Sequence, residues 1–137
     1  MNGLKSLADL TGIDWGPPPP GASVLVKERH ELRRKPIREL SVEEIRRLLD
    51  MGCEAEILVP VAVERSDVGE SVALLCAILR VRNYDWRGHA DELRLVRDQV
   101  YHADNLLGQI EGDLDTLAIR VSIWRLYAEF ERNLSAA

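Results

Sequence analysis

The sequence predicts an all-α fold, a single-domain bundle of about six helices that ends in a long antiparallel helix hairpin. Three observations support this class. The chain has 137 residues, 46% of them hydrophobic, which fits one domain with its own core. Seven residues are aromatic, so Leu, Ile, Val and Ala must fill most of that core. Apolar residues also recur at helical spacing in several stretches of the chain.

The first 20 residues are expected to form an arm. Ser6 to Leu10 can open a short helix, and residues 11–16 predict a turn with Trp15 as an apolar anchor. Pro17 to Pro20 are consecutive prolines, which favour an extended spacer because they cannot continue a helix. The whole chain, 1–137, is expected to form one helical domain. After the arm, it consists of a helical part over 21–86 and a C-terminal helix pair over 87–137.

Two helices are predicted in the next part of the chain. Residues 22–34 suit a helix that ends before Pro36, since the residue preceding a proline avoids the helical region. Ser41 and Glu44 then have the spacing of a capping box. Apolar residues at positions 42, 45, 48 and 49 give this second helix one buried face, and Gly52 is expected to stop it in a left-handed conformation.

Residues 54–66 favour a further helix that either restarts or kinks at Pro60, although their β-branched content also permits a buried strand. Residues 70–81 are apolar nearly all round and predict the central buried helix. Helices over 91–110 and 114–134 follow. One packing stripe of the last helix should contain Leu117, Val121, Trp124 and Ala128, widened by apolar residues at positions 119, 123, 126 and 130.

No set of reactive side chains predicts an enzyme. Histidines stand at positions 30, 89 and 102 without metal-ligand spacing, and Cys53 and Cys76 are far apart in the sequence. We therefore expect no catalytic residues, no metal site and no cofactor. Both thiols are expected to be buried and free, with a disulfide left open as an alternative.

The net charge of −5 is unevenly distributed. Residues 42–70 contain three arginines and eight carboxylates, which gives −5 in that segment alone. An acidic protein suits a basic protein partner better than a phosphate backbone. The stretch 27–38, with six Lys or Arg and two Glu, nevertheless leaves a nucleic-acid-binding regulator as an alternative, and a small protein–protein adaptor is a third. No apolar stretch reaches membrane-spanning length and no signal peptide is visible, so we expect a cytoplasmic protein.

Several short motifs occur in a characteristic order. They are Ser6-Leu-Ala-Asp-Leu10, Asp14-Trp15, His30-Glu-Leu-Arg-Arg-Lys-Pro-Ile37, Leu40-Ser-Val-Glu-Glu-Ile-Arg46 and Leu58-Val-Pro-Val-Ala-Val-Glu64. With the apolar positions up to Trp86, this set resembles the immunity proteins of bacterial contact-dependent growth inhibition over about residues 6–86. Family members tend to have an acidic, tyrosine-containing stretch after the last motif, whereas this chain has Gly69 to Leu75 without those tyrosines and aspartates.

The resemblance implies a protein that binds and neutralises the C-terminal toxin domain of a large cell-surface effector. Many such toxins are nucleases, whose phosphate-binding surfaces are basic, and the acidic middle of this chain suits such a surface. We expect the contacts to include four carboxylates near two predicted turns, Glu54, Glu56, Asp67 and Glu70. The departure at Gly69 to Leu75 implies a toxin different from those of the relatives.

Overall fold

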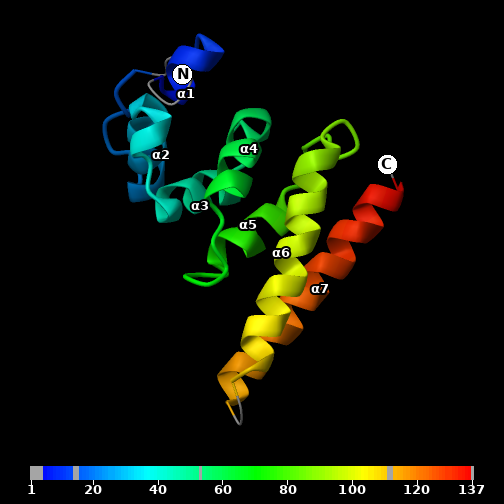
Figure 1. The fold of residues 1–137 in the computed structure, drawn as a ribbon. Coiled ribbons are helices and arrows are strands. Elements are labelled where there is room, and N and C mark those ends of the chain that lie inside the picture. The colour runs from blue at the N-terminus through cyan, green and yellow to red at the C-terminus, as the bar shows by residue number, and fades with distance from the viewer. Residues whose placement is uncertain (1–4, 14–15, 53, 111–112, 137) are drawn as a thin grey trace.

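In the described part of the chain, seven α-helices and one short 3-10 helix form the fold of the computed structural model (Figure 1). The structure describes residues 5–13, 16–52, 54–110 and 113–136. The helices are α1 (Leu7–Thr11), α2 (Val24–Arg34), η2 (Ile37–Glu39), α3 (Val42–Asp50), α4 (Ala55–Arg65), α5 (Ala73–Arg80), α6 (Ala90–Gly108) and α7 (Leu114–Ala136). No strand occurs in these ranges, so the predicted all-α class is confirmed and the strand alternative for 54–66 is wrong. Trp15 and Cys53 lie outside the described residues, as do the predictions made for them.

The predicted end of α2 and the predicted cap and stop of α3 are confirmed, whereas α2 begins at Val24, two residues after the predicted start. α2 ends at Arg34, two residues before Pro36. At the start of α3, Ser41 Oγ accepts a hydrogen bond from the Glu44 N–H at 3.1 Å, and a Glu44 carboxylate oxygen accepts one from the Ser41 N–H at 2.9 Å. Gly52 follows α3 with φ of +74°, the left-handed conformation expected of a helix stop.

Two local features differ from the sequence prediction. α4 begins five residues before Pro60 and runs through it as one helix, so the alternative in which a new helix starts at this proline is wrong. The 3-10 helix η2 had no clear sequence signal, and it buries Ile37. Arg65 at the end of α4 donates to the carbonyl oxygens of Ile37 and Leu40, and these bonds hold η2 against α4.

α5 is the central helix, as predicted. It packs against α3, α4, α6 and α7. The helix is shorter than the predicted 70–81, but five of its eight residues are buried, namely Leu74, Leu75, Ala77, Ile78 and Leu79. The aromatic part of the core adjoins this helix. There the ring centroid of Trp86 lies 4.7 Å from that of Tyr84 and 5.1 Å from that of Phe130.

α6 and α7 lie side by side and run antiparallel along one flank of the molecule (Figure 1). Arg97 pairs with Glu131 at 2.7 Å, and Asp104 pairs with Arg120 at 2.9 Å, so residues further along α6 meet residues nearer the start of α7. The end of the pair at the α6–α7 connection extends beyond the other helices in Figure 1. The two long helices thus form a flank that is only partly covered by the rest of the fold.

The packing stripe predicted for α7 is wrong in part. Ile123 and Phe130 are buried at 1% and 2% exposure. Leu117 and Val121, expected on the main stripe, are 53% and 49% exposed, while Trp124 is half-buried. α7 has apolar residues on two faces, and the periodicity does not indicate which face the rest of the chain covers.

Candidate functional site

α4 separates the four carboxylates expected to contact a partner into two pairs. Glu54 and Glu56 lie at its N-terminal end, whereas Asp67 and Glu70 lie in the turn after its C-terminal end. A helix of 11 residues is about 16 Å long. The structure therefore does not bring the four together at one point, although both pairs fit within the footprint of a single protein interface.

Glu54 is engaged inside the fold. The Arg33 side chain is 2% exposed, and its Nη1 donates to Glu54 Oε1. The other terminal nitrogen of Arg33 donates to the Ile13 carbonyl oxygen at 3.0 Å and lies 3.4 Å from the Thr11 hydroxyl. This arrangement joins α2, the segment after α1 and the start of α4. The charge of Glu54 is thus largely taken up by the protein's own arginine.

Asp67 and Glu70 are exposed on a well-formed turn between α4 and α5. A carboxylate oxygen of Asp67 accepts from the Gly69 N–H at 2.9 Å, and the Asp67 carbonyl oxygen accepts from the N–H groups of Glu70 and Ser71 at 3.0 and 2.9 Å. Val68 inside the turn is 8% exposed and anchors it to the core. The turn therefore holds both carboxylates in solvent on a fixed backbone.

Glu56 belongs to a set of carboxylates that come from separate parts of the chain. The negative charges of Glu92, Asp85 and Glu56 all act on the buried hydroxyl of Tyr84. Burial foremost, and then these negative charges, raise the pKa of Tyr84 to about 12. We call Glu56, Asp85 and Glu92 the Tyr84 acidic group. They come from the start of α4, the α5–α6 loop and the start of α6, and a count of charge along the chain cannot join such distant residues.

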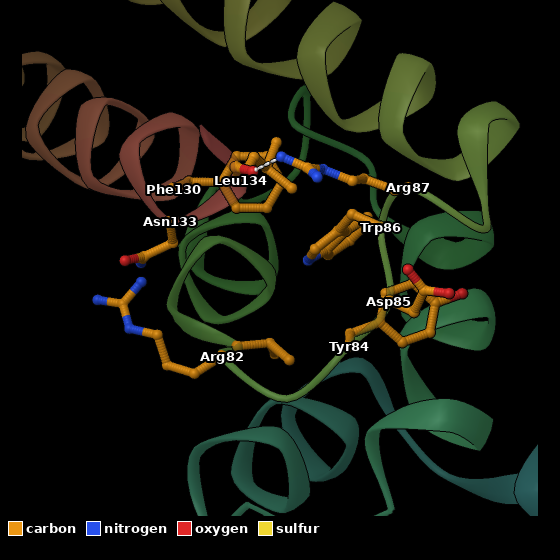
Figure 2. Close-up of a pocket in the computed structure, with 9 residues that line it drawn as sticks. Arg82, Tyr84, Asp85, Trp86, Arg87, Phe130, Asn133 and Leu134 are labelled. Atoms are coloured by element: carbon orange, nitrogen blue, oxygen red, sulfur yellow. Dashed lines mark hydrogen bonds between the residues drawn. The ribbon is translucent and has the colours of Figure 1, made fainter. Parts of the chain in front are cut away.

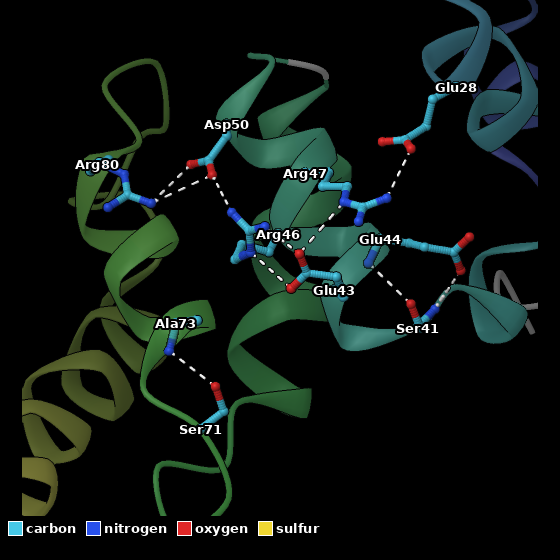
Figure 3. A network of polar contacts seen from close by, with 10 residues as sticks. All are labelled: Glu28, Ser41, Glu43, Glu44, Arg46, Arg47, Asp50, Ser71, Ala73 and Arg80. Atoms are coloured by element: carbon cyan, nitrogen blue, oxygen red, sulfur yellow. Dashed lines mark hydrogen bonds and ion pairs between the residues drawn. The ribbon is translucent and has the colours of Figure 1, made fainter. Parts of the chain in front are cut away.

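The carboxylates of α3, in contrast, are paired. Asp50 accepts from Arg46 at 2.9 Å and from Arg80 at 3.2 Å, and Glu43 accepts from the Arg46 Nε–H at 2.9 Å (Figure 3). The hydrogen bond from Arg46 lowers the pKa of Glu43. The three carboxylates of α3 therefore all have basic partners, whereas the exposed carboxylates of residues 42–70 that form no ion pair with a described residue lie at the two ends of α4.

A small cavity lies between the α5–α6 loop and the end of α7 (Figure 2). Its volume is about 180 Å³, and Arg82, Trp86 and Asn133 line it. Arg87 closes one side by donating to the Leu134 carbonyl oxygen. The volume is below the range of about 300–1,000 Å³ that is usual for small-molecule sites. The cavity is therefore suited to one side chain of a partner rather than to a substrate or cofactor.

The part of the chain that the structure describes also bears on metal binding and membrane insertion. There, no three His, Cys, Asp or Glu side chains form a group that could hold a metal ion. None of the helices in that part is both long and apolar enough to cross a membrane. Cys76 is half-buried in α5, and burial raises the pKa of its thiol.

The fold and these surfaces define a small all-α protein with exposed carboxylates at both ends of α4. Residues 9–66 match the model of the family described as CDI immunity proteins, where CDI stands for contact-dependent growth inhibition. The resemblance seen in the sequence is thereby confirmed, over a shorter range than the expected 6–86. No curated protein and no solved structure matches the chain. The match ends at Ser66, just before Gly69 to Leu75, where the sequence departs from the family pattern.

Proposed function

We propose that this protein neutralises the toxin of a contact-dependent growth inhibition system by binding its toxin domain directly. The observation that carries the proposal is the family match over residues 9–66, which suggests toxin neutralisation. These residues include α2, α3 and α4, the part of the fold that the Arg33–Glu54 pair holds together. The protein acts by binding, without catalysis of its own, in the cytoplasm of the cell it protects.

The contact surface is proposed to be acidic. Asp67 and Glu70 at one end of α4, and the Tyr84 acidic group at the other, present carboxylates to solvent about 16 Å apart. Glu54 lies at the same end of α4 as Glu56, and its pair with Arg33 stabilises that end. The toxin that fits such a surface is a basic one, for which a nuclease is the leading candidate, and opposite charges would speed its association.

A nucleic-acid-binding role is less well supported. Three charged residues of the basic stretch 27–38 have acidic or basic partners within the protein. Arg33 pairs with Glu54, Lys35 pairs with Glu44 at 3.0 Å, and Glu28 pairs with Arg47 at 2.8 Å. Arg33 is buried and cannot reach a phosphate. The stretch therefore does not present its six basic side chains as one surface, as strong phosphate binding requires.

The test uses the C-terminal domain of the protein encoded directly upstream. Calorimetric titration of that domain with the full chain, at two salt concentrations, should give nanomolar binding that weakens as salt rises. Absence of binding to the toxin domain, together with no protection of cells that express it, would overturn the proposal.

Three charge-reversed variants then locate the surface. Glu56→Lys/Asp85→Lys changes one end of α4, and Asp67→Lys/Glu70→Lys changes the other. Glu31→Lys/Asp98→Lys is the matched control, because both residues are exposed and lie outside the proposed surface. We expect each of the first two variants to weaken binding by at least about tenfold and the control to bind as the unchanged chain does. Equal affinity for all three would show that the acidic surface is not the contact.

A further inference from the structure

α7 has apolar side chains on two opposite faces. Ile123 and Phe130 point into the core, with exposures of 1% and 2%. Leu114, Leu117 and Val121 are 81%, 53% and 49% exposed. At about 100° per residue, Val121 lies about 160° around the helix from Ile123, on the side away from the core. The helix therefore has a second apolar face that the described part of the chain leaves open.

We call this second face the outer stripe of α7. It consists of Leu114, Leu117, Ala118, Val121, Arg125 and Ala128, all of them exposed. Single exposed apolar residues are ordinary, but these recur at spacings of three and four over several turns, as in helices that pack along another helix. Its alanines would allow a neighbouring helix to approach closely. The exposed Tyr101 of α6, whose ring lies 5.4 Å from that of Trp124, borders it.

Charge indicates which partner suits the outer stripe. Arg125 is the charged residue of the stripe, and Arg132 follows on the same side of α7, four residues after Ala128. Both arginines are exposed and form no ion pair with any described residue. No carboxylate lies among the stripe residues, so the stripe does not suit the basic toxin proposed above. Two exposed carboxylates, Asp113 and Asp115, lie at the beginning of α7. The helix is thus acidic where it starts and basic further along its outer side.

We infer that the outer stripe binds the same stripe of a second copy of this chain, with the two α7 helices antiparallel. In that arrangement Leu117 of each copy faces Val121 of the other, and the arginine end of each stripe approaches the acidic start of its partner. A two-fold symmetric contact of this kind is self-complementary and closes after two copies. The two α6–α7 hairpins then form one four-helix layer. The ends of α4 are not part of this contact, so each copy keeps its proposed toxin-binding surface.

The inference is tested on the full chain alone, so its outcome does not depend on the toxin proposal. Sedimentation velocity from about 1 to 300 µM should show a concentration-dependent monomer–dimer equilibrium. Val121→Asp should weaken dimerisation by at least about tenfold, because a charge would replace an apolar contact at the centre of the interface. Val24→Asp is the matched control, since Val24 is 79% exposed on α2, and it should leave the equilibrium unchanged. Circular dichroism melting of both variants checks that neither unfolds.

A crosslinking experiment tests the antiparallel arrangement. In a Cys53→Ser/Cys76→Ala background, chains with Leu117→Cys are mixed with chains with Val121→Cys and oxidised. The antiparallel contact predicts mainly disulfides between the two kinds of chain, whereas a parallel pair would give Leu117→Cys homodimers. A chain that stays monomeric at every concentration, a dimer that Val121→Asp does not affect, or a majority of homodimeric disulfides would each overturn the inference.

Discussion

The buried guanidinium of Arg33 and the carboxylate of Glu54 form an ion pair that links α2 to the beginning of α4. The Arg33 side chain is 2% exposed and that of Glu54 is 23% exposed, so a break in the pair leaves a charge in a poorly solvated place. The same arginine also donates to the Ile13 carbonyl oxygen. The Arg33 side chain thus connects three segments of the chain, namely α2, the segment after α1 and the beginning of α4.

Arg33→Met is expected to reduce the free energy of unfolding by about 3 kcal/mol, because it leaves the Glu54 carboxylate without its partner. Glu54→Leu should also destabilise the protein, since the buried Arg33 charge is then unpaired. The double variant should lose less free energy of unfolding than the two single variants lose together, because it leaves neither charge without a partner. Urea unfolding of the four proteins gives this comparison.

A surface pair provides the control for this cycle. Lys35 lies 3.0 Å from Glu44, and its side chain is 39% exposed. Lys35→Met should change the unfolding free energy by no more than about 0.5 kcal/mol, since water solvates either charge when the other is lost. If Arg33→Met changed stability as little as Lys35→Met does, the buried pair would not be the link between α2 and α4.

Pro60 carries a second prediction about α4. It stands inside a continuous helix, where a proline has no N–H to donate to the carbonyl of Glu56 and its ring crowds that carbonyl. Pro60→Ala is expected to raise the free energy of unfolding by about 1 kcal/mol, the gain in helix geometry exceeding the flexibility that alanine adds to the unfolded chain. Thermal and urea unfolding should both show the increase. Val61→Ala, a neighbouring half-buried position, should instead lower stability, and a loss of stability in Pro60→Ala would contradict the prediction.

The sequence predicted those parts of the fold that depend on neighbouring residues. The capping box of Ser41 and Glu44, the helix end before Pro36 and the stop at Gly52 all involve residues a few positions apart, and all are observed. The helix η2 had no such signal, because it is held by bonds from Arg65, which lies far along the chain.

The surfaces were predicted less well, since they depend on contacts between distant segments. Arg33 belongs to the basic stretch that left nucleic-acid binding as an alternative, but it is buried and pairs with Glu54. Asp85 lies outside the acidic segment 42–70, yet in the fold its charge and that of Glu56 both act on Tyr84. In α7, Val121 and Ile123 are equally plausible core residues in the sequence, and the position of α5 and α6 decides that Ile123 is buried.

Asp104 makes the stability of the α6–α7 pair dependent on pH. Its Oδ1 accepts from Arg120 Nε and from Trp124 Nε1, each at 2.9 Å. The hydrogen bond from Arg120, followed by that from Trp124, lowers the pKa of Asp104 below its ordinary value of about 3.9. The carboxylate therefore contributes stability above the pKa of the unfolded chain, and this contribution is lost as the pH falls through the lower pKa of the folded state.

Asp104→Asn is accordingly expected to lower the urea midpoint at pH 7 and to have a smaller effect as the pH falls through the lowered pKa of the folded state, where the original carboxylate becomes protonated. Trp124 fluorescence reports on the same site, because its indole N–H binds Asp104 directly. Asp98→Asn removes an exposed carboxylate of α6 that forms no ion pair with a described residue, so it should follow the unchanged protein at each pH. A midpoint difference for Asp104→Asn that stays constant as the carboxylate becomes protonated would show that its effect comes from packing, with no contribution from the ionised carboxylate.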